Sequence, residues 1–183
     1  MKISLVRHAE TEWNYKNLMQ GKKNLELNDE GIRHAKKLKE KIKDLNYDYC
    51  YMSPLLRTVQ TAIILIGDRV ETIPDKRLIE RDLGELEGKS RDLYDHDKYW
   101  DYKLNSGDLG VEKVQDVFKR CEDFLNYIVN KYDDDTSILI VAHGAPIRAL
   151  HHILSNTDRY GDLASVKIPN CYYHEYEYKK KND

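Results

Sequence analysis

The sequence predicts a three-layer α/β/α fold, in which helices cover both faces of a mainly parallel sheet. Short apolar runs typical of buried strands, at residues 3–6, 47–52 and 138–142, alternate with segments of helical periodicity. Strands that alternate with helices usually run parallel, because each helix carries the chain back to the edge where the previous strand began. With 183 residues, the chain is expected to form a single domain over residues 1–183.

The first half of the chain supplies strand and helix signals in regular order. A strand begins at residue 2, and Asn28 is placed to cap the helix that follows. The apolar face of that helix consists of Ile32, Ala35, Leu38, Ile42 and Leu45. After the second strand, Ser53 as N-cap and Pro54 at the first helical position predict the start of another helix. A short third strand is expected at 70–73.

The second half continues the alternation after an irregular stretch. Residues 89–110 are polar and aromatic without clear periodicity, so this segment is either a lid over the sheet edge or a plain surface loop. A long helix is predicted over 112–131, where apolar residues again repeat at helical spacing. The strand at 138–142 leads into a helix with Pro146 near its start. Residues 171–178 alternate loosely, which predicts an edge strand near the C-terminus.

The composition argues against several classes of protein. A formal net charge of −2 and an isoelectric point near 6.4 give no indication of nucleic-acid binding. The mean hydropathy is −0.75 and no apolar run approaches the length of a membrane span, so no membrane association is expected. The first strand leaves no room for a signal peptide, and three cysteines without a C-x-x-C pair indicate reduced thiols. These features predict a cytoplasmic protein.

Two histidines and two arginines follow predicted strands. Arg7 and His8 end the first strand, Arg57 comes shortly after the second, and His143 follows the strand at 138–142. The carboxyl ends of parallel strands meet at the edge where ligands bind, so these side chains are expected to converge. Arginine forks bind phosphoryl oxygens and a neutral histidine can act as a nucleophile. The pattern predicts a phosphoryl-transfer site with Arg7 and Arg57 as clamps, His8 as nucleophile and His143 as a second phosphate donor.

Such a site also needs a general acid for the leaving oxygen, and a carboxyl group is suited to this role. Glu80, Glu85 and Glu87 lie close together in the sequence, and physical reasoning alone does not choose between them. The adjacent His151-His152 suggests a metal site with His143. Because the predicted helix offers no suitably placed carboxylates, no metal is expected.

Five ordered blocks of the sequence resemble the histidine phosphatase superfamily, in its phosphoglycerate mutase-like branch. They are L-V-R-H-A-E-T-E-W-N from Leu5, Gln20-Gly21, S-P-L-x-R-T from Ser53, L-x-E-x-x-x-G-x-x-E-G from Leu78 and V-A-H-G from Val141. The resemblance implies that His8 becomes phosphorylated, that Glu80 donates the proton, and that no metal or other cofactor is needed. It further implies a phosphate pocket lined by Arg7, Asn14, Gln20, Arg57 and His143, with Gly21 and Gly144 among the substrate-binding residues.

Three functions follow from this resemblance. The leading hypothesis is a metal-independent phosphatase that hydrolyses small phosphomonoesters through phosphorylated His8. The alternative is a cofactor-dependent phosphoglycerate mutase, which must shelter phosphohistidine from water. Only residues 89–110 could provide that cover, so water is the expected acceptor, and the aromatic residues Tyr94, Tyr99, Trp100 and Tyr102 are expected to form an open rim. A non-catalytic protein that binds phosphorylated ligands is the third hypothesis. The oligomeric state is left open.

Overall fold

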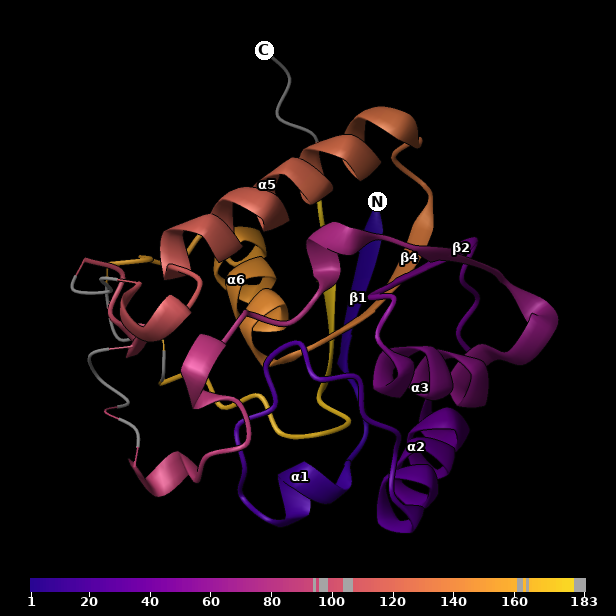
Figure 1. Cartoon of the computed structure of the whole chain (residues 1–183). Helices are drawn as coiled ribbons and strands as arrows, with labels where there is room; N and C mark the ends of the chain where they lie inside the picture. Colours follow the sequence, from indigo (N-terminus) through magenta and orange to yellow (C-terminus); the bar gives the residue numbers. More distant parts are fainter. Residues whose placement is uncertain (94, 96–98, 104–106, 161–162, 164, 180–183) are drawn as a thin grey trace.

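The computed structural model describes residues 1–93, 95, 99–103, 107–160, 163 and 165–179 of the chain. It has the predicted α/β architecture, with a five-stranded sheet between two layers of helices (Figure 1). The strands are β1 (Lys2–Arg7), β2 (Tyr49–Met52), β3 (Glu71–Pro74), β4 (Ser137–Ala142) and β5 (Tyr173–Glu177). The helices are α1 (Glu12–Tyr15), α2 (Asp29–Ile42), α3 (Leu56–Ile66), α5 (Val114–Lys131) and α6 (Gly144–Leu154), joined by short 3-10 helices that include Lys76–Leu78 and Gly84–Leu86.

The sheet has the strand order β3-β2-β4-β1-β5. The first four strands in this order run parallel, and β5 runs antiparallel to β1 at the edge. The mainly parallel sheet with an edge strand near the C-terminus is therefore confirmed. At the carboxyl end, Arg7 of β1 lies opposite Ala142 of β4, and Met52 of β2 lies opposite Val141. The chain segments that follow these three strands consequently start from the same edge.

The pleat of the strands divides the core between the two faces of the sheet, because successive side chains point to opposite sides. On one face, Ile3 and Leu5 of β1 pack with α5 and α6. On the other face, Val6 of β1 packs with α2 and α3. Figure 1 shows the same arrangement, with α5 and α6 on one side of the strands and α2 and α3 on the other. Asn28 caps α2 as predicted, since its side chain accepts from the backbone N–H of Gly31 at 2.7 Å.

The start of α3 differs from the prediction. The helix begins at Leu56, and its N-cap, Leu55, makes no side-chain capping bond. The hydroxyl of Ser53, which was expected to cap it, lies 2.8 Å from Nε2 of His143. The predicted first helical residue, Pro54, is therefore wrong: the Ser53 hydroxyl accepts from the backbone N–H of Leu55 at 3.3 Å, before the helix begins, and also contacts His143 across the sheet edge. The long helix α5 also begins later than expected, at Val114.

The described part of segment 89–110 lies beside the carboxyl edge of the sheet. Its beginning is fixed by backbone hydrogen bonds, from Met19 N to Lys89 O at 2.9 Å and from Arg91 N to Asn17 O at 3.0 Å. Further along, Trp100 lines the same cavity as Arg7. Both a lid and a fixed loop fit this arrangement, so the choice between them stays a prediction.

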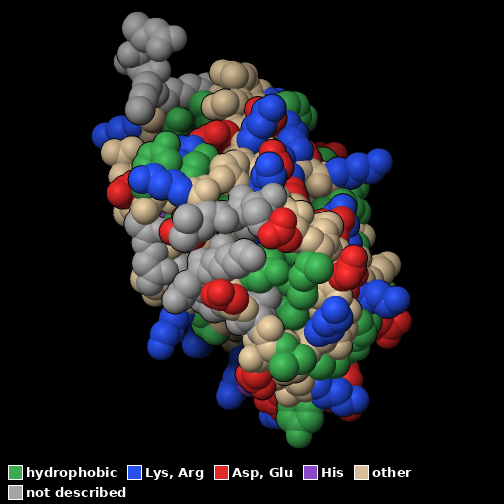
Figure 2. All heavy atoms as spheres, turned by 60° about the vertical axis from the view of Figure 1, so that its left-hand side comes forward, with side chains coloured by type: hydrophobic (Ala, Val, Ile, Leu, Met, Phe, Trp, Pro, Cys, Tyr) green, Lys and Arg blue, Asp and Glu red, His purple; other side chains and the backbone are tan. Residues whose placement is uncertain are grey.

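The surface on this side of the molecule carries charges of both signs. Basic and acidic side chains are interspersed over the face shown in Figure 2. Within the described residues, no helix is both long enough and apolar enough to cross a membrane.

Candidate active site

The ends of β1 and β4 bring two histidines together. The backbone N–H of His8 donates to the carbonyl of Ala142 at 3.0 Å, which aligns the residues directly after the two strands. The rings of His8 and His143 consequently lie 5.2 Å apart between centroids, at an interplanar angle of 61°. Both side chains are buried, with exposed fractions of 2% and 0%. The predicted convergence of His8 and His143 is therefore observed.

The environment of His8 fixes which ring nitrogen carries the proton. Its Nδ1 lies 2.7 Å from the carbonyl oxygen of Ala9. Because a carbonyl oxygen can only accept, Nδ1 must be the protonated nitrogen, and the lone pair is on Nε2. Burial, followed by the positive charges of Arg57 and Arg7, lowers the pKa of His8 well below its ordinary value of 6.5. The ring is thus neutral near pH 7, with a nucleophilic Nε2.

Arg57 holds His143 in the complementary orientation. Its Nε–H donates to Nδ1 of His143 at 3.1 Å, so the proton of the neutral His143 ring is on Nε2, directed at Oγ of Ser53. The two Nη groups of Arg57 donate to the carbonyls of Lys23 and Gly21 at 2.7 and 2.9 Å. Burial lowers the pKa of Arg57 to about 10, so it remains a cation near neutral pH. Ser53 is a site residue that the sequence analysis assigned to helix capping instead.

A cavity of about 140 Å³ opens beside these residues. It is lined by Arg7, Met19, Glu80, Arg81, Leu83, Arg91, Trp100, Gly144, Ala145, Arg148 and Ile168. The buried Nε of Arg7 has no hydrogen-bond partner among the described residues, while its Nη1 donates to the carbonyl of Ile168. Burial and repulsion from Arg91 lower the pKa of Arg7 to about 10. His8, Arg57 and His143 do not belong to the lining and lie deeper in the protein.

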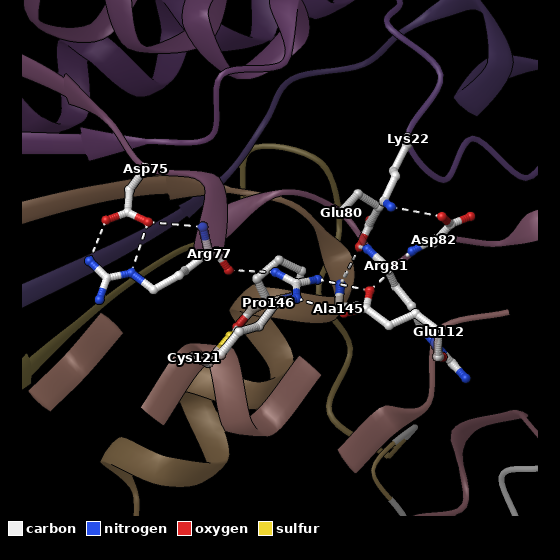
Figure 3. Close-up of polar contacts among 11 residues, drawn as sticks. Lys22, Asp75, Arg77, Glu80, Arg81, Asp82, Glu112, Cys121, Ala145 and Pro146 are labelled. Atoms are coloured by element: carbon white, nitrogen blue, oxygen red, sulfur yellow. Dashed lines mark hydrogen bonds and ion pairs between the residues drawn. The ribbon is translucent and has the colours of Figure 1, made fainter. Parts of the chain in front are cut away.

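Glu80 is placed at the N-terminus of α6. Its Oε2 accepts from the backbone N–H of Gly144 at 3.0 Å, and its Oε1 accepts from Ala145 at 3.0 Å and from Arg81 at 2.8 Å. Figure 3 shows this carboxylate directed at Ala145. Three N–H donors suit an ionised carboxylate, whose two oxygens only accept. Gly144 lies close to the side chains of Glu80 and Arg7. A Cβ on Gly144 would be 3.5 Å from Oε2 of Glu80 and 4.0 Å from Cζ of Arg7.

The other two glutamates occupy different places. Oε1 of Glu87 accepts from the backbone N–H of Lys22 at 2.6 Å and packs against Gly21, where a Cβ would meet it at 2.0 Å. Gly21 has a φ of +49°, which also favours glycine. The side chain of Glu85 is exposed. Of the three candidates, Glu80 is the one that lines the cavity.

Neither of the predicted amide side chains, Asn14 and Gln20, lines the cavity, and Asn14 is linked to the nucleophile. Oδ1 of Asn14 accepts from the backbone and hydroxyl of Thr11, both at 3.2 Å, and from Nδ2 of Asn170 at 3.2 Å. The same Nδ2 donates to the carbonyl of His8 at 3.0 Å, which links Asn14 to the nucleophile's backbone. Gln20 is 5% exposed, and its Oε1 has no hydrogen-bond partner within the described chain.

Comparison with known proteins decides the family. A family model described as the histidine phosphatase superfamily (branch 1) matches residues 3–182. The chain belongs to this superfamily. Phosphoserine phosphatase 1 from Hydrogenobacter thermophilus is 32% identical over 165 residues, which cover 86% of this chain and 78% of that protein. A 2,3-bisphosphoglycerate-dependent phosphoglycerate mutase from Methylobacterium sp. is 30% identical over 165 residues, which cover 83% of this chain and 79% of that protein.

Solved structures lead to the same superfamily. A mutant phosphoserine phosphatase from Entamoeba histolytica, in complex with phosphoserine, has a TM-score of 0.82 and 26% identity, and the match covers 95% of this chain and 89% of that one. The relatives of this member of the histidine phosphatase superfamily thus include phosphatases and phosphoglycerate mutases.

The cavity of this superfamily member contains residues that were not predicted from the sequence to be part of the site. Arg148, one helical turn after Gly144 on α6, has its Cζ 4.3 Å from the centroid of the Trp100 ring. Arg91 enters the cavity from segment 89–110. The spacing between Gly144 and Arg148 was a usable signal, because residues four apart share a helix face. Nothing local in the sequence indicated the contact with Trp100.

The predicted aromatic rim is reduced to Trp100. Tyr99 is buried with Met19, Leu86 and Val111, and its exposed fraction is 9%. Tyr102 packs edge-on against Phe118, with 5.4 Å between ring centroids. The prediction is therefore wrong for Tyr99 and Tyr102, which contribute to packing instead. Tyr94 lies outside the described residues.

The two histidines considered as metal ligands have other partners. Nδ1 of His151 is hydrogen-bonded to the hydroxyl of Tyr176, and Nδ1 of His152 lies 2.7 Å from Oγ1 of Thr157. In the part of the chain that the structure describes, no group of three or more His, Cys, Asp or Glu side chains could hold a metal ion.

Proposed function

We propose that this protein is a metal-independent phosphatase that hydrolyses small phosphomonoesters through a phosphohistidine on His8. The observation that carries the proposal is the hydrogen bond from Nδ1 of His8 to Ala9, which leaves a neutral ring with its lone pair on Nε2. Arg57 and Arg7 place positive charge near that ring, and the unpartnered Nε of Arg7 is a free N–H donor among the described residues, which suits a phosphoryl group in transfer.

The first half of the proposed reaction forms the phosphoenzyme. The substrate phosphate enters through the cavity and binds the guanidinium of Arg7. Nε2 of His8 attacks the phosphorus, the bond from phosphorus to the ester oxygen breaks, and the leaving oxygen takes a proton from Glu80. For this step Glu80 has to carry a proton, and the three amide donors around it suit the carboxylate that it becomes.

The second half returns the enzyme to its starting state. Glu80, now a carboxylate, accepts a proton from a water molecule as that water attacks the phosphohistidine. The bond between Nε2 and phosphorus breaks and inorganic phosphate leaves. The same carboxyl group thus acts as acid and then as base.

The cavity also supports a substrate class. Its lining contains four arginines, Arg7, Arg81, Arg91 and Arg148, and one carboxylate, that of Glu80. This excess of positive charge suits a phosphomonoester that carries a second anionic group. Its volume of about 140 Å³ suits a small substrate, since cavities of about 150 Å³ accommodate benzene. A small phosphorylated acid such as phosphoserine meets both conditions, and phosphoserine phosphatases are among the relatives.

One observation favours the mutase as a second candidate. His8 is 2% exposed, and Trp100 of segment 89–110 lines the cavity, so the nucleophile is more sheltered than the sequence predicted. A sheltered phosphohistidine survives longer before hydrolysis, as a mutase requires.

The test compares the two reactions in one purified preparation. Phosphate release from phosphoserine is measured in excess EDTA, beside interconversion of 2- and 3-phosphoglycerate with 2,3-bisphosphoglycerate. We expect phosphate release that EDTA does not affect. Interconversion with negligible release would establish the mutase, and activity that needs added zinc or magnesium would contradict the metal-independent mechanism.

A further inference from the structure

Glu80 stands in a stretch of chain without regular secondary structure, between the 3-10 helices Lys76–Leu78 and Gly84–Leu86. Its carboxylate nevertheless meets the amides of Gly144 and Ala145 at 3.0 Å each. An irregular segment has no hydrogen-bond ladder of its own, so other parts of the chain must determine its position.

Glu112 holds the residues directly after Glu80. Its backbone N–H donates to the carbonyl of Asp82 at 2.9 Å, and its Oε2 accepts from the backbone N–H of Asp82 at 3.1 Å. Its carbonyl accepts from Nε of Arg81 at 2.6 Å. Figure 3 shows Glu112 beside Arg81 and Asp82, on the side away from Asp75. Glu112 therefore fixes the position of the two residues that follow Glu80 in the sequence.

Arg120, on α5, connects Glu112 to the residues that precede Glu80 in the sequence. Its Nε lies 2.8 Å from Oε1 of Glu112 and its Nη2 lies 3.2 Å from Oε2, so the pair is bidentate. Its Nη1 donates to the carbonyl of Arg77, three residues before Glu80. Both side chains of the ion pair are 19% exposed. A bidentate pair has a defined geometry, so Glu112 and Arg120 together bracket Glu80 on both sides.

Helix α5 also contacts the first turn of α6, whose backbone amides bind the carboxylate of Glu80. The thiol of Cys121, next to Arg120, donates to the carbonyl of Pro146 in the first turn of α6 at 3.8 Å, as drawn in Figure 3. The carboxylate of Glu80 and the α6 amides that bind it are consequently positioned against one common support, α5.

We propose that Glu112 and Arg120 are positioning residues for proton transfer by Glu80. The inference rests on the proposed function, because it assumes that Glu80 protonates the leaving oxygen. Neither residue lines the cavity, so both act through Glu80 and not on the substrate. Their loss lowers kcat for esters whose leaving oxygen needs a proton, and KM changes little because Arg7 is untouched.

The experiment uses Glu112→Gln and Arg120→Lys, each assayed with phosphoserine and with p-nitrophenyl phosphate. We expect kcat to fall about 10- to 100-fold with phosphoserine, the usual cost of misplacing a reacting group. With p-nitrophenyl phosphate, whose leaving group needs little protonation, the loss is expected to stay below about 3-fold. Arg120→Lys keeps the charge and tests the bidentate geometry if Glu112→Gln does not fold.

Arg77→Gln is the matched control. It removes a local ion pair with Asp75 at 2.6 Å, and it removes two contacts that tie this stretch to α5, the stacking of Arg77 on Tyr127 at 4.7 Å and the hydrogen bond to the carbonyl of Asp123 at 3.2 Å. It leaves Glu112 and the Arg77 carbonyl in place. The control is expected to lower the melting temperature without changing the ratio of the two activities. If Arg77→Gln changes the ratio of the two activities as much as Glu112→Gln or Arg120→Lys does, the proposal is overturned.

A double-mutant cycle with Glu80→Gln completes the test. If Glu112 acts through Glu80, adding Glu112→Gln to Glu80→Gln leaves the activity ratio unchanged. If the double variant instead shows the product of the two single losses in activity ratio, the positioning role of Glu112 is overturned, while the proton-donor role of Glu80 is unaffected. If Glu80→Gln itself shows no dependence on the leaving group, the proton-donor role in the proposed function is the part that fails.

Discussion

The Nε–H of Arg57 donates to Nδ1 of His143 at 3.1 Å, so a buried guanidinium determines the tautomer of a buried imidazole. The two Nη groups of the same arginine are bound to backbone carbonyls. Lysine cannot reproduce this three-way arrangement. We expect Arg57→Lys to lower kcat/KM about 10²-fold, because the position and tautomer of His143 beside the nucleophile would be lost. Steady-state kinetics with phosphoserine checks this, and a loss below about 10-fold would contradict the assigned role.

His8→Ala is expected to abolish phosphatase activity while the protein remains folded, because the residue follows β1 and the hydrogen bond of its ring goes to the carbonyl of its own neighbour, Ala9. The check is a quench in alkaline detergent after incubation with labelled substrate, because phosphohistidine is labile in acid and stable in base. Phosphohistidine should be present in the native protein and absent in the variant. Near-native turnover by His8→Ala would exclude the covalent mechanism.

Glu80→Gln should lower kcat about 10²- to 10⁴-fold for phosphoserine, the usual contribution of a general acid. The loss should be much smaller for p-nitrophenyl phosphate. Glu87→Gln serves as the control, since its carboxylate contacts the Lys22 backbone instead of the cavity. A leaving-group effect in Glu87→Gln and not in Glu80→Gln would reverse the assignment.

The pH dependence follows from the two buried histidines. Burial, with Arg57 nearby, places the folded-state pKa of His8 and of His143 well below 6.5. Below pH 6.5 the unfolded chain therefore binds more protons than the folded one, and the free energy of unfolding falls as the pH is lowered. Each histidine contributes a slope of up to about 1.4 kcal/mol per pH unit in that window. Urea unfolding at pH 5, 6, 7 and 8 measures the slope, which His143→Gln should reduce.

Arg91 is expected to discriminate between substrates. Arg91→Gln should lower kcat/KM for phosphoserine about 5-fold, the effect of losing one exposed charge pair. Its effect on O-phosphoethanolamine, which lacks the carboxylate, should be negligible. Lys89→Gln is the matched control, because Lys89 is a nearby exposed cation outside the cavity lining. Equal effects on both substrates would contradict recognition of a second anionic group.

Much of the architecture could be predicted because it depends on local pattern. The apolar run at 138–142 is buried on both faces of the sheet, and such strands are almost continuously hydrophobic. The convergence of His8 and His143 followed from strand ends alone, since parallel strands share their carboxyl edge.

The remaining details depend on contacts between distant segments. The role of Ser53 was missed because a serine before proline gives the same local signal whether it caps a helix or meets His143. Physical reasoning from the sequence did not choose between Glu80 and Glu87, because the choice depends on the position of α6, and only the family resemblance indicated Glu80. The shielding of His8 likewise depends on how segment 89–110 packs.

Because Glu80 binds the first amides of α6, selection can retain this side chain for two separate reasons. Besides any part in proton transfer, it serves as the N-terminal cap that His143, at the N-cap position, does not provide. Loss of such a cap costs about 1 kcal/mol, enough for selection on stability alone to retain it. A descendant that had lost turnover would still benefit from glutamate here. The ring of His8, by contrast, bonds to the carbonyl of its own neighbour, so its retention is the stronger sign of an active enzyme.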